Sequence, residues 1–495
     1  MPVKTTTLAT DPVLVQQHEL TLSTNTGTNN QDRTFSATIL TYGATLTHLS
    51  CPDRWNQPQD VVLGFDHWQD YIAQAQPGAL NPYFGSIIGP TASRIANATF
   101  QLENTHTHSN TTTITAASPT QAPTHALQVS NGLDCHHGGP KGFDKQYWST
   151  VDVNQDETSV TLEWVSPHGD GGYPGRLVSS VQYKLTDQGE LVIEFTAQLK
   201  EGEKSEGAAE NATTMDLHST IVSLTNHAYW NLDGVLNLSE DQAGQLQSLL
   251  LETPSTPGTS TDINDNNVVV IKNSCTVKDH TLWLSTSTLV ELGDKHPVPT
   301  GVLVDVIVTP ELHVQKELLD FTGAETHPVS KNKALGHGLD LIPGGYGYDH
   351  VFALDGTDAT HTIPVPVNNV EIQAYWPRTP HVATLYSPRS GIRLDLSTSE
   401  PAVVLYASGY LDKSLPRTKS KILDIPTTAT SVHTVAGGVD ESKVRIEAEF
   451  DKFAGFCLEP IRYPDAIHHR DWASMVTLHH DQVYRHRSLY KFSAE

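Results

Sequence analysis

The chain has 495 residues, and its 31 Lys and Arg against 56 Asp and Glu give a formal charge of −25 at pH 7. This negative charge disfavours non-specific binding to nucleic acid or to anionic lipid, so we expect a neutral small molecule as the partner. The four cysteines are far apart, the N-terminus lacks an apolar signal core, and no stretch is long enough to span a membrane, which together predict free thiols and a cytoplasmic protein.

The predicted elements are short strands. In chain order, β-branched and aromatic runs occur at 159–166 (SVTLEWVS), 191–199 (LVIEFTAQL), 391–399 (GIRLDLSTS) and 402–411 (AVVLYASGYL). Residues 181–195 predict a hairpin that turns at 187–189, where Gly189 supplies the positive φ of a tight turn. Helical periodicity is hard to find. The sequence therefore predicts an all-β fold.

Three polar segments, near 104–128, 201–214 and 252–278, contain little apolar area to bury, so we expect them to be inserted surface loops. None has the character of a linker between autonomous domains, no repeat period is found, and no GxGxxG opens a helix after a strand. We therefore expect residues 1–34 to be a lead-in with the first strand, and residues 35–495 to form a single domain.

Potentially reactive polar groups occur in five segments that are otherwise rich in glycine, aromatic or apolar residues. These segments are NPYFGSIIGPTASRIANATF (81–100), NGLDCHHGGPKGFDKQYW (131–148), SLTNHAYWNL (223–232), GGYGYDHVFAL (344–354) and FAGFCLEPIRYPDA (453–466). In such contexts a polar group is held in packed surroundings, so each segment is a candidate part of a site.

Segment 223–232 contains a candidate general acid. A strand here would place Asn226, Ala228 and Trp230 on one side and His227 and Tyr229 on the other. His227 would then lie beside an aromatic ring, and its near-neutral pKa suits proton donation. A structural histidine is the alternative.

Segment 453–466 contains a candidate base. Glu459 follows an apolar run and precedes Pro460, which predicts a carboxylate at the end of a buried strand. Burial would raise its pKa, and a neighbouring Arg would lower it. The alternative is a glutamate that pairs with Arg462 or is exposed at a strand end.

Three further positions suit the binding of hydroxyl groups. Asp349 lies between a Tyr-rich turn and an apolar strand, and Arg94 offers a bidentate fork; a turn-forming aspartate and a structural salt bridge are the alternatives. His136 and His137 precede two glycines, but adjacent residues usually point apart, which disfavours a metal site. A hydrogen-bonding role is expected for one of the two histidines.

Taken in this order, the segments resemble the galactose mutarotase (aldose 1-epimerase) family. Further similarities lie at YGATLTHLSCPDR (42–54), DVVLGFDHWQDY (60–71), SPHGDGGYPGRL (166–177), VPTG (298–301) and LDF (319–321). Tyr484, Tyr490 and Phe492 look like the closing strand of the family. The resemblance extends from about residue 35 to the C-terminus, interrupted by the predicted loops.

The resemblance implies a β-supersandwich with an open sugar-binding cleft. It implies an enzyme that interconverts the α and β anomers of a free hexose such as glucose or galactose, with no cofactor and no metal. By their positions in the family motifs, Glu459 matches the general base, His227 the general acid, and Arg94, His137 and Asp349 the residues that bind the sugar. We expect a monomer or a weak homodimer.

The chain departs from the family pattern around these residues. Ser93 stands where Asn is usual, Pro90 replaces an Arg, and Val404 replaces a Gln that many members direct at the sugar. Pro460 follows the glutamate where some members have Thr. These changes leave the acid and the base in place, so they bear on substrate preference rather than on reaction type.

Three other functions remain open on the sequence alone. A glycoside hydrolase would use Asp349 and Glu459 as its two carboxyl groups, which leaves the histidines without a role. A non-catalytic sugar-binding or sensing protein on the same fold needs no matched acid and base. Epimerisation of hexose 6-phosphates would need a basic pocket, for which Arg417 and Arg462 are the candidates.

Overall fold

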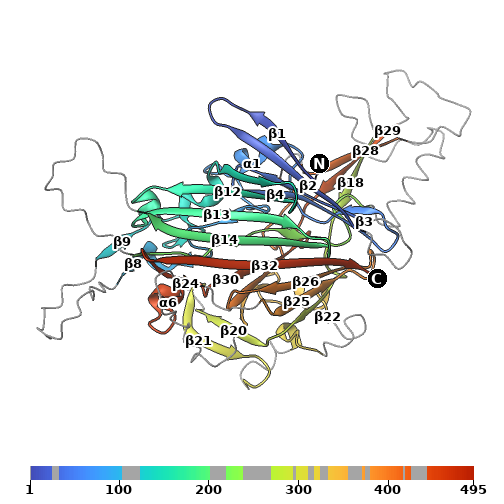
Figure 1. The fold of residues 1–495 in the computed structure, drawn as a ribbon. Coiled ribbons are helices and arrows are strands. Elements are labelled where there is room, and N and C mark those ends of the chain that lie inside the picture. The colour runs from blue at the N-terminus through green and yellow to red at the C-terminus, as the bar shows by residue number, and fades with distance from the viewer. Residues whose placement is uncertain are drawn as a thin grey trace, which may run out of the picture.

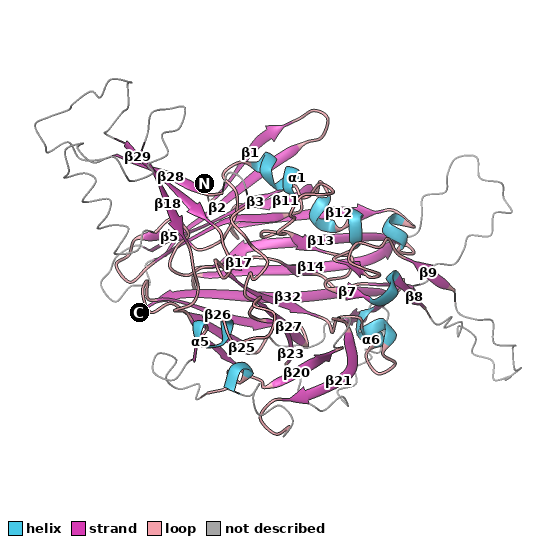
Figure 2. Cartoon of the chain, turned by 180° about the vertical axis from the view of Figure 1, so that it is seen from behind, coloured by secondary structure: helices cyan, strands magenta, loops and turns pink. Residues whose placement is uncertain are grey.

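The computed structural model is built almost entirely of β-strands, as the sequence predicts (Figures 1 and 2). It describes residues 2–24, 33–102, 123–200, 219–237, 269–293, 297–309, 317–323, 333–354, 371–373, 379–415, 418–424 and 443–495. The α-helices with described bounds are short, namely α1 (Trp68–Gln74), α5 (Gly336–Leu339) and α6 (Ala473–Val476). None of the helices in the described residues is long and apolar enough to cross a membrane.

The largest sheet has ten strands, and β12, β13, β14 and β32 cross the centre of Figure 1 side by side. Its order is β11 (Ser149–Asn154), β12 (Ser159–Ser166), β13 (Arg176–Leu185), β14 (Glu190–Lys200), β32 (Gln482–Ala494), β26 (Ile392–Thr398), β25 (His381–Tyr386), β19 (Thr281–Leu284) and β22 (Lys333–Ala334), with β24 (Glu371–Gln373) parallel to β32. Buried and partly exposed residues alternate along β13 and β32. This period of two buries one face of the sheet in the core.

A six-stranded sheet carries the residues of most interest. Its order is β17 (Tyr229–Trp230), β30 (Phe456–Ile461), β27 (Ala402–Tyr406), β23 (Asp349–Ala353), β20 (Thr288–Leu292) and β21 (Pro299–Asp305), with every pair antiparallel. One face packs on the ten-stranded sheet in the main core, where Leu405 and Leu458 of this sheet join Leu394 and Tyr490 of the larger one. The opposite face is therefore available for a site.

Smaller sheets complete the fold. The N-terminal sheet is an antiparallel meander of β1 (Val3–Ala9), β2 (Val15–Thr24), β3 (Arg33–Leu40), β4 (Thr45–Pro52) and β5 (Pro58–Asp60). A three-stranded sheet contains β18 (Val269–Ser274), β29 (Lys443–Glu449) and β28 (Ser420–Asp424). The two-stranded pairs are β6 (Ile87–Ile88) with β16 (Thr225–Asn226), β7 (Arg94–Ile95) with β10 (Cys135–His136), β8 (Thr99–Gln101) with β9 (Thr124–Ala126), and β15 (Ser219–Ile221) with β31 (Thr477–His479).

The predicted strands and hairpin are present. The predicted strand at 159–166 is β12, and those beginning at 191, 391 and 402 are β14, β26 and β27, although β27 ends at Tyr406. The hairpin closes with Leu185 opposite Leu191, and Gly189 has a φ of +73°. A Cβ at this glycine would lie 2.9 Å from the ring of Phe35, so both the backbone angle and the packing require glycine here.

The predicted insertions are only partly described. Residues 104–122, 201–214 and 252–268 lie outside the described residues. The remainder is not all loop, because β9 and β18 begin inside the predicted segments. The β-branched run Val269, Val270 and Ile271 favours a strand, and it pairs in parallel with β29. The polar character of the preceding residues concealed this strand.

The four cysteines are buried free thiols, as expected from their spacing.

Candidate active site

The outer face of the six-stranded sheet brings together side chains from four strands. Asp349 of β23 pairs with Tyr406 of β27, Tyr406 pairs with Cys457 of β30, and Cys457 pairs with Tyr229 of β17. Directly opposite residues in antiparallel strands project to the same face with Cβ atoms about 4.5–5.5 Å apart. The register thus builds a continuous row of four functional side chains from distant parts of the sequence.

Glu459 lies in the next row on this face, two residues along β30 from Cys457. Its cross-strand partner is Val404, which pairs in turn with Val351. The prediction that Glu459 ends its strand is wrong, because β30 continues through Pro460 to Ile461. Proline is tolerated where a strand edge has no partner, and β17 pairs only with Phe456 and Cys457 of β30. Glu459 is therefore held in mid-strand, with 3% of its surface exposed.

His227 reaches the same place from a break between two strands. The predicted continuous strand is divided into β16 and β17. At the break, the side chain of Asn226 bonds two main-chain groups: it donates to Gly85 O of a neighbouring segment at 2.7 Å and accepts from Ala228 N at 3.1 Å. The side chain of His227 points at the base, and its Nε2 lies 3.6 Å from Oε1 of Glu459. The two predicted catalytic residues thus form a buried pair.

Two tyrosine rings enclose the imidazole of His227. Tyr229 stacks on it with centroids 5.1 Å apart, as the predicted side of the strand requires, and Tyr83 stacks on it at 5.6 Å; both interplanar angles are 24°. Trp230, on the other side of the predicted strand, lies in the core against Tyr490. Both stacked rings hinder rotation of the imidazole about its Cβ–Cγ bond, because this rotation tilts the imidazole out of the stack.

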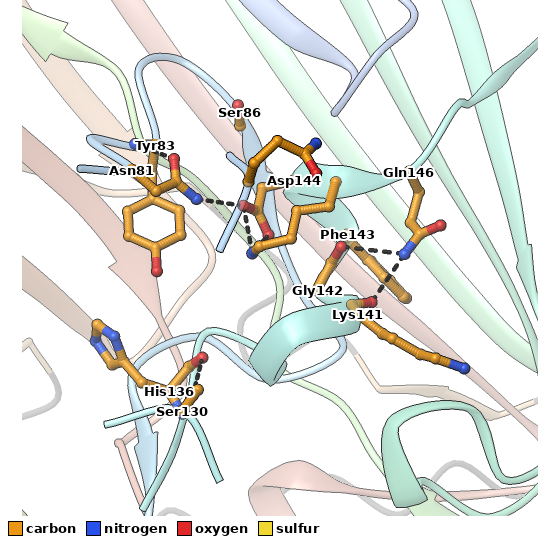
Figure 3. Close-up of polar contacts among 12 residues, drawn as sticks. Asn81, Tyr83, Ser86, Ser130, His136, Lys141, Gly142, Phe143, Asp144 and Gln146 are labelled. Atoms are coloured by element: carbon orange, nitrogen blue, oxygen red, sulfur yellow. Dashed lines mark hydrogen bonds and ion pairs between the residues drawn. The ribbon is translucent and has the colours of Figure 1, made fainter. Parts of the chain in front are cut away.

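Tyr83 is a site residue that the sequence analysis missed. Its backbone has a φ of +57° and donates to the side chain of Asn81 at 3.1 Å. Asn81 also donates to buried Asp144 at 2.9 Å (Figure 3). Asp144 in turn pairs with Lys145. The ammonium of Lys145 lies 5.4 Å from the ring centroid of Tyr83. This network holds Tyr83 over His227, and only the Asn two positions earlier signals the turn in the sequence.

A short hairpin brings Arg94 and His137 to the site. Arg94 of β7 pairs directly with His136 of β10, and the backbone of Ser93 donates to Nδ1 of His137 at 3.1 Å. A neutral imidazole that accepts at Nδ1 carries its proton on Nε2. Burial lowers the pKa of His137 well below its usual value. His137 therefore presents an N–H donor to a ligand.

The expectation that the two adjacent histidines point apart is wrong. The imidazole centroids of His136 and His137 lie 3.6 Å apart, and the ring of His137 is 5.6 Å from that of His227. His137 follows the end of β10 and has a φ of +53°, which turns its side chain back. The alternation rule applies to extended backbone and fails at a left-handed residue.

The predicted binding groups are left without partners in the protein. Among the described residues, the guanidinium of Arg94 makes no hydrogen bond or ion pair, and its Nε is buried. Asp349 is exposed, and its carboxylate likewise accepts no hydrogen bond from the described residues. Buried polar groups are normally satisfied. The buried, unpartnered Nε of Arg94 therefore indicates a polar ligand, and the exposed carboxylate of Asp349 is free to accept from the same ligand.

The structural alternatives for these residues are not observed. Arg462 pairs with buried Glu400 at 2.8 Å and does not pair with Glu459. Because this ion pair occupies its guanidinium in the interior, Arg462 does not provide a free cation for a phosphate group. Arg417, the other predicted phosphate ligand, lies outside the described residues.

Burial shifts the proton affinities of Glu459 and His227 in opposite directions. Desolvation, with a smaller contribution from the charge of Asp349, raises the pKa of Glu459 well above its usual range. Desolvation lowers the pKa of His227 to about 4. Mutual attraction in the charged pair opposes both shifts. A carboxylate of increased basicity therefore faces an imidazole of increased acidity, which suits proton transfer in both directions.

A metal ion would find three nearby ligand atoms here. One donor atom from each of His227, Cys457 and Glu459 lies within 4.8 Å of the other two. However, Nδ1 of His227 faces Cys457 and Nε2 faces Glu459. An ion bound to Nδ1 would therefore lie away from Glu459, and an ion bound to Nε2 would lie away from Cys457. Burial also raises the pKa of the Cys457 thiol well above its usual value. The arrangement fits a proton-transfer pair better than a metal site.

An all-β sandwich with a buried carboxyl–imidazole pair beside unpartnered polar groups has the features of an enzyme that works by acid–base proton transfer. A family model described as aldose 1-epimerase matches residues 28–272 and 268–491. The chain belongs to the aldose 1-epimerase family.

Relatives and solved structures agree with this assignment. Human galactose mutarotase is 28% identical over 455 residues, which cover 92% of this chain and 90% of that protein. Aldose 1-epimerase of Escherichia coli K12 is 32% identical over 215 residues, 43% of this chain and 48% of that protein. Galactose 1-epimerase of Lactobacillus acidophilus has a TM-score of 0.60 at 17% identity, with 99% and 98% of the chains covered. A GalM/aldose epimerase homologue from C. elegans has a TM-score of 0.58 at 21% identity, with 97% and 99% covered. These two structures share the fold of this chain.

Proposed function

We propose that the protein interconverts the α and β anomers of a free aldose, with Glu459 as the general base and His227 as the general acid. The observation that carries this proposal is the 3.6 Å contact between Nε2 of His227 and Oε1 of Glu459, both buried and both shifted in pKa. A protein that only binds sugar has no use for such a pair. The unpartnered side chains around it supply hydrogen bonds for the substrate.

The reaction needs two proton transfers. Glu459 removes the proton from the hydroxyl group on C1 while Nε2 of His227 protonates the ring oxygen, so the bond between C1 and the ring oxygen breaks and an aldehyde forms. Rotation about the C1–C2 bond exposes the other face of the aldehyde. Ring closure returns both protons and yields the other anomer, and the enzyme recovers its starting state without a covalent intermediate.

The binding residues fix the sugar in the geometry for transfer. Nε2–H of His137 donates to the ring oxygen or to a neighbouring hydroxyl group, and Arg94 and Asp349 hold other hydroxyl groups. Val404 lies opposite Glu459 in the sheet, so the substrate meets an apolar surface beside the base. At position 93 the bond to His137 comes from the main chain, so serine in place of the usual asparagine preserves it.

The direct test is to follow anomer interconversion of freshly dissolved α-D-glucose, α-D-galactose and α-D-xylose by polarimetry, with glucose 6-phosphate as a fourth substrate. We expect acceleration of at least one free sugar and little acceleration of the phosphate, because Arg462 is buried in an ion pair. Sugar binding without faster interconversion would instead support a binding or sensing protein.

Replacing Arg94 with Ala should raise KM by roughly 10-fold or more, since a charge-assisted hydrogen bond contributes about 1.5–3 kcal/mol. The effect on kcat should be smaller, because Arg94 holds hydroxyl groups rather than moving protons. Arg485→Ala is the matched control, because Arg485 is exposed on β32 of the other large sheet. An unchanged KM in Arg94→Ala would remove this arginine from the binding site.

We also propose that the enzyme acts in the cytoplasm as a monomer or weak homodimer. The four buried free thiols support the first part, because disulfides are rare in the reducing cytosol. Sedimentation across a range of concentrations tests the second, and a stable dimer at the lowest concentration would contradict it.

A further inference from the structure

Cys457 is in contact with the proposed acid but has no part in the mechanism above. Its Sγ lies 3.7 Å from Nδ1 of His227, within the range of a hydrogen bond to sulfur, and its side chain is fully buried. The other ring nitrogen, Nε2, faces Glu459. The thiol and the carboxylate come from the same face of β30, two residues apart. They therefore hold opposite ends of one imidazole.

We propose that Cys457 is a positioning residue for the acid: its thiol holds Nδ1 of His227, so that Nε2 alone is directed at Glu459 and the substrate. This inference rests on the proposed function. It concerns the orientation of the imidazole and adds no group that touches the sugar.

The stacked tyrosines leave two orientations of the ring between which the thiol can distinguish. Tyr83 and Tyr229 both stack on the imidazole with interplanar angles of 24°, which favours ring orientations that lie in the present plane. A half-turn about the bond to Cβ keeps the stacking but exchanges the positions of the nitrogen and carbon atoms on the two sides. The contact with Cys457 is lost in that orientation. The sulfur therefore selects between two orientations that stack equally well.

A thiol suits the proton cycle of this histidine. Nε2 gives and regains a proton during the reaction, so Nδ1 keeps its own proton throughout and needs an acceptor. The sulfur is a weak acceptor, and burial keeps the thiol protonated by raising its pKa. No anion then lies beside Nδ1 to stabilise the imidazolium, whereas a carboxylate in that place would make His227 a weaker acid.

The other titratable groups around the ring are consistent with this division of roles. Glu459 faces Nε2, and His137, Tyr83, Tyr229 and Tyr406 surround the ring with centroids within 6.2 Å. His136 lies behind His137, and burial lowers the pKa of both histidines. Arg94, with a permanent positive charge, disfavours protonation of these two histidines. Among these groups, Glu459 is the anionic partner in contact with His227.

The test compares Cys457→Ala, which removes the partner, with Cys457→Ser, which replaces it with a hydroxyl group. Cys51→Ala is the matched control, because Cys51 is a buried thiol in the N-terminal sheet. We expect Cys457→Ala to lower kcat roughly 3- to 10-fold, the effect of one neutral hydrogen bond on a rate, with KM within twofold. Cys457→Ser should recover most of kcat, and Cys51→Ala should keep kcat whatever its thermal stability.

A second measurement reads the imidazole directly in the free protein. With histidine labelled by ¹⁵N, the resonances of His227 are identified by their absence in His227→Asn. We expect Nδ1 to carry a proton in the wild type and in Cys457→Ser, both in the neutral ring and in the imidazolium that donates from Nε2. In Cys457→Ala the neutral ring should be a mixture of both tautomers. Unchanged ¹⁵N shifts together with unchanged kcat in Cys457→Ala would overturn the proposal, even if that variant melts at a lower temperature. If the wild type fails to accelerate anomer interconversion, the proposed function fails, while the ¹⁵N shifts still decide the role of the thiol.

Discussion

Replacing Glu459 with Gln should lower kcat for anomer interconversion by about 10²–10⁴-fold, the usual contribution of a general base, and change KM only a few-fold. Glutamine has nearly the same shape but cannot accept the proton of the C1 hydroxyl group. Polarimetry at saturating sugar measures the loss. Glu19→Gln on the exposed side of β2 is the control, and it should retain the wild-type rate. A Glu459→Gln enzyme with full kcat would exclude this base.

The activity of the wild type should decrease at acidic pH with a midpoint above the ordinary range for glutamate. The base must be ionised to act, and burial together with Asp349 raises the pKa of Glu459. Raising the pKa of a required base moves the acidic limb of the profile of kcat/KM upward. A profile that stays flat down to the ordinary pKa of glutamate would contradict this prediction.

The substitution Glu459→Gln should also stabilise the folded protein at neutral and alkaline pH. A carboxyl group whose pKa is raised on folding binds its proton more tightly in the folded state, so the free energy of unfolding decreases as pH rises from the unfolded pKa to the folded pKa. Glu459→Gln removes this penalty, which we expect to be about 1–3 kcal/mol. The gain in melting temperature should appear at pH 8 and vanish near pH 4. A loss of stability at pH 8 would show that the buried carboxylate is well compensated.

Local patterns in the sequence were sufficient for the strands, and they also singled out two residues, His227 and Glu459, that the structure brings into contact. The run at 159–166 alternates with the period of a strand and forms β12 without error. His227 and Glu459 stand in short polar–apolar motifs whose family resemblance names their roles, and the structure brings them within 3.6 Å. Such motifs can be recognised in the sequence because they depend on residues close together in the chain.

Features that depend on strand register or on a left-handed backbone conformation could not be predicted from local sequence patterns. The row of Asp349, Tyr406, Cys457 and Tyr229 exists because four strands from distant segments align, and no local pattern sets that register. The convergence of His136 and His137 depends on one positive φ. Each is a tertiary effect that overrides a local rule.

Register also explains why the departures from the family pattern leave the acid–base pair intact. Val404 is the cross-strand partner of Glu459, so in the proposed site its side chain would lie beside the base and could change which hydroxyl groups are bound. Ser93 bonds His137 through its backbone N–H, which any residue but proline supplies. On the proposed function, substrate preference and proton transfer would therefore depend on different atoms of the site.

Replacing His227 with Asn should also lower kcat by about 10²–10⁴-fold, because an amide can hydrogen-bond to the ring oxygen but cannot protonate it. The loss in the double variant with Glu459→Gln should be much smaller than the product of the two single losses, since base and acid act in one concerted step and neither is effective alone. His18→Asn is the matched control: His18 is also buried, burial also lowers its pKa to about 4, and its ring bonds Thr5 and Thr150.

The control separates loss of chemistry from loss of folding. His18→Asn should reduce the melting temperature and keep kcat, because a buried imidazole outside the site contributes hydrogen bonds and packing alone. His227→Asn should show the reverse balance, with a large loss of kcat and a smaller change in stability, since burial opposes the charged form of His227. If His227→Asn retained the wild-type rate while Glu459→Gln did not, the proton for the ring oxygen would come from another donor, and Nε2–H of His137 would be the group to test next.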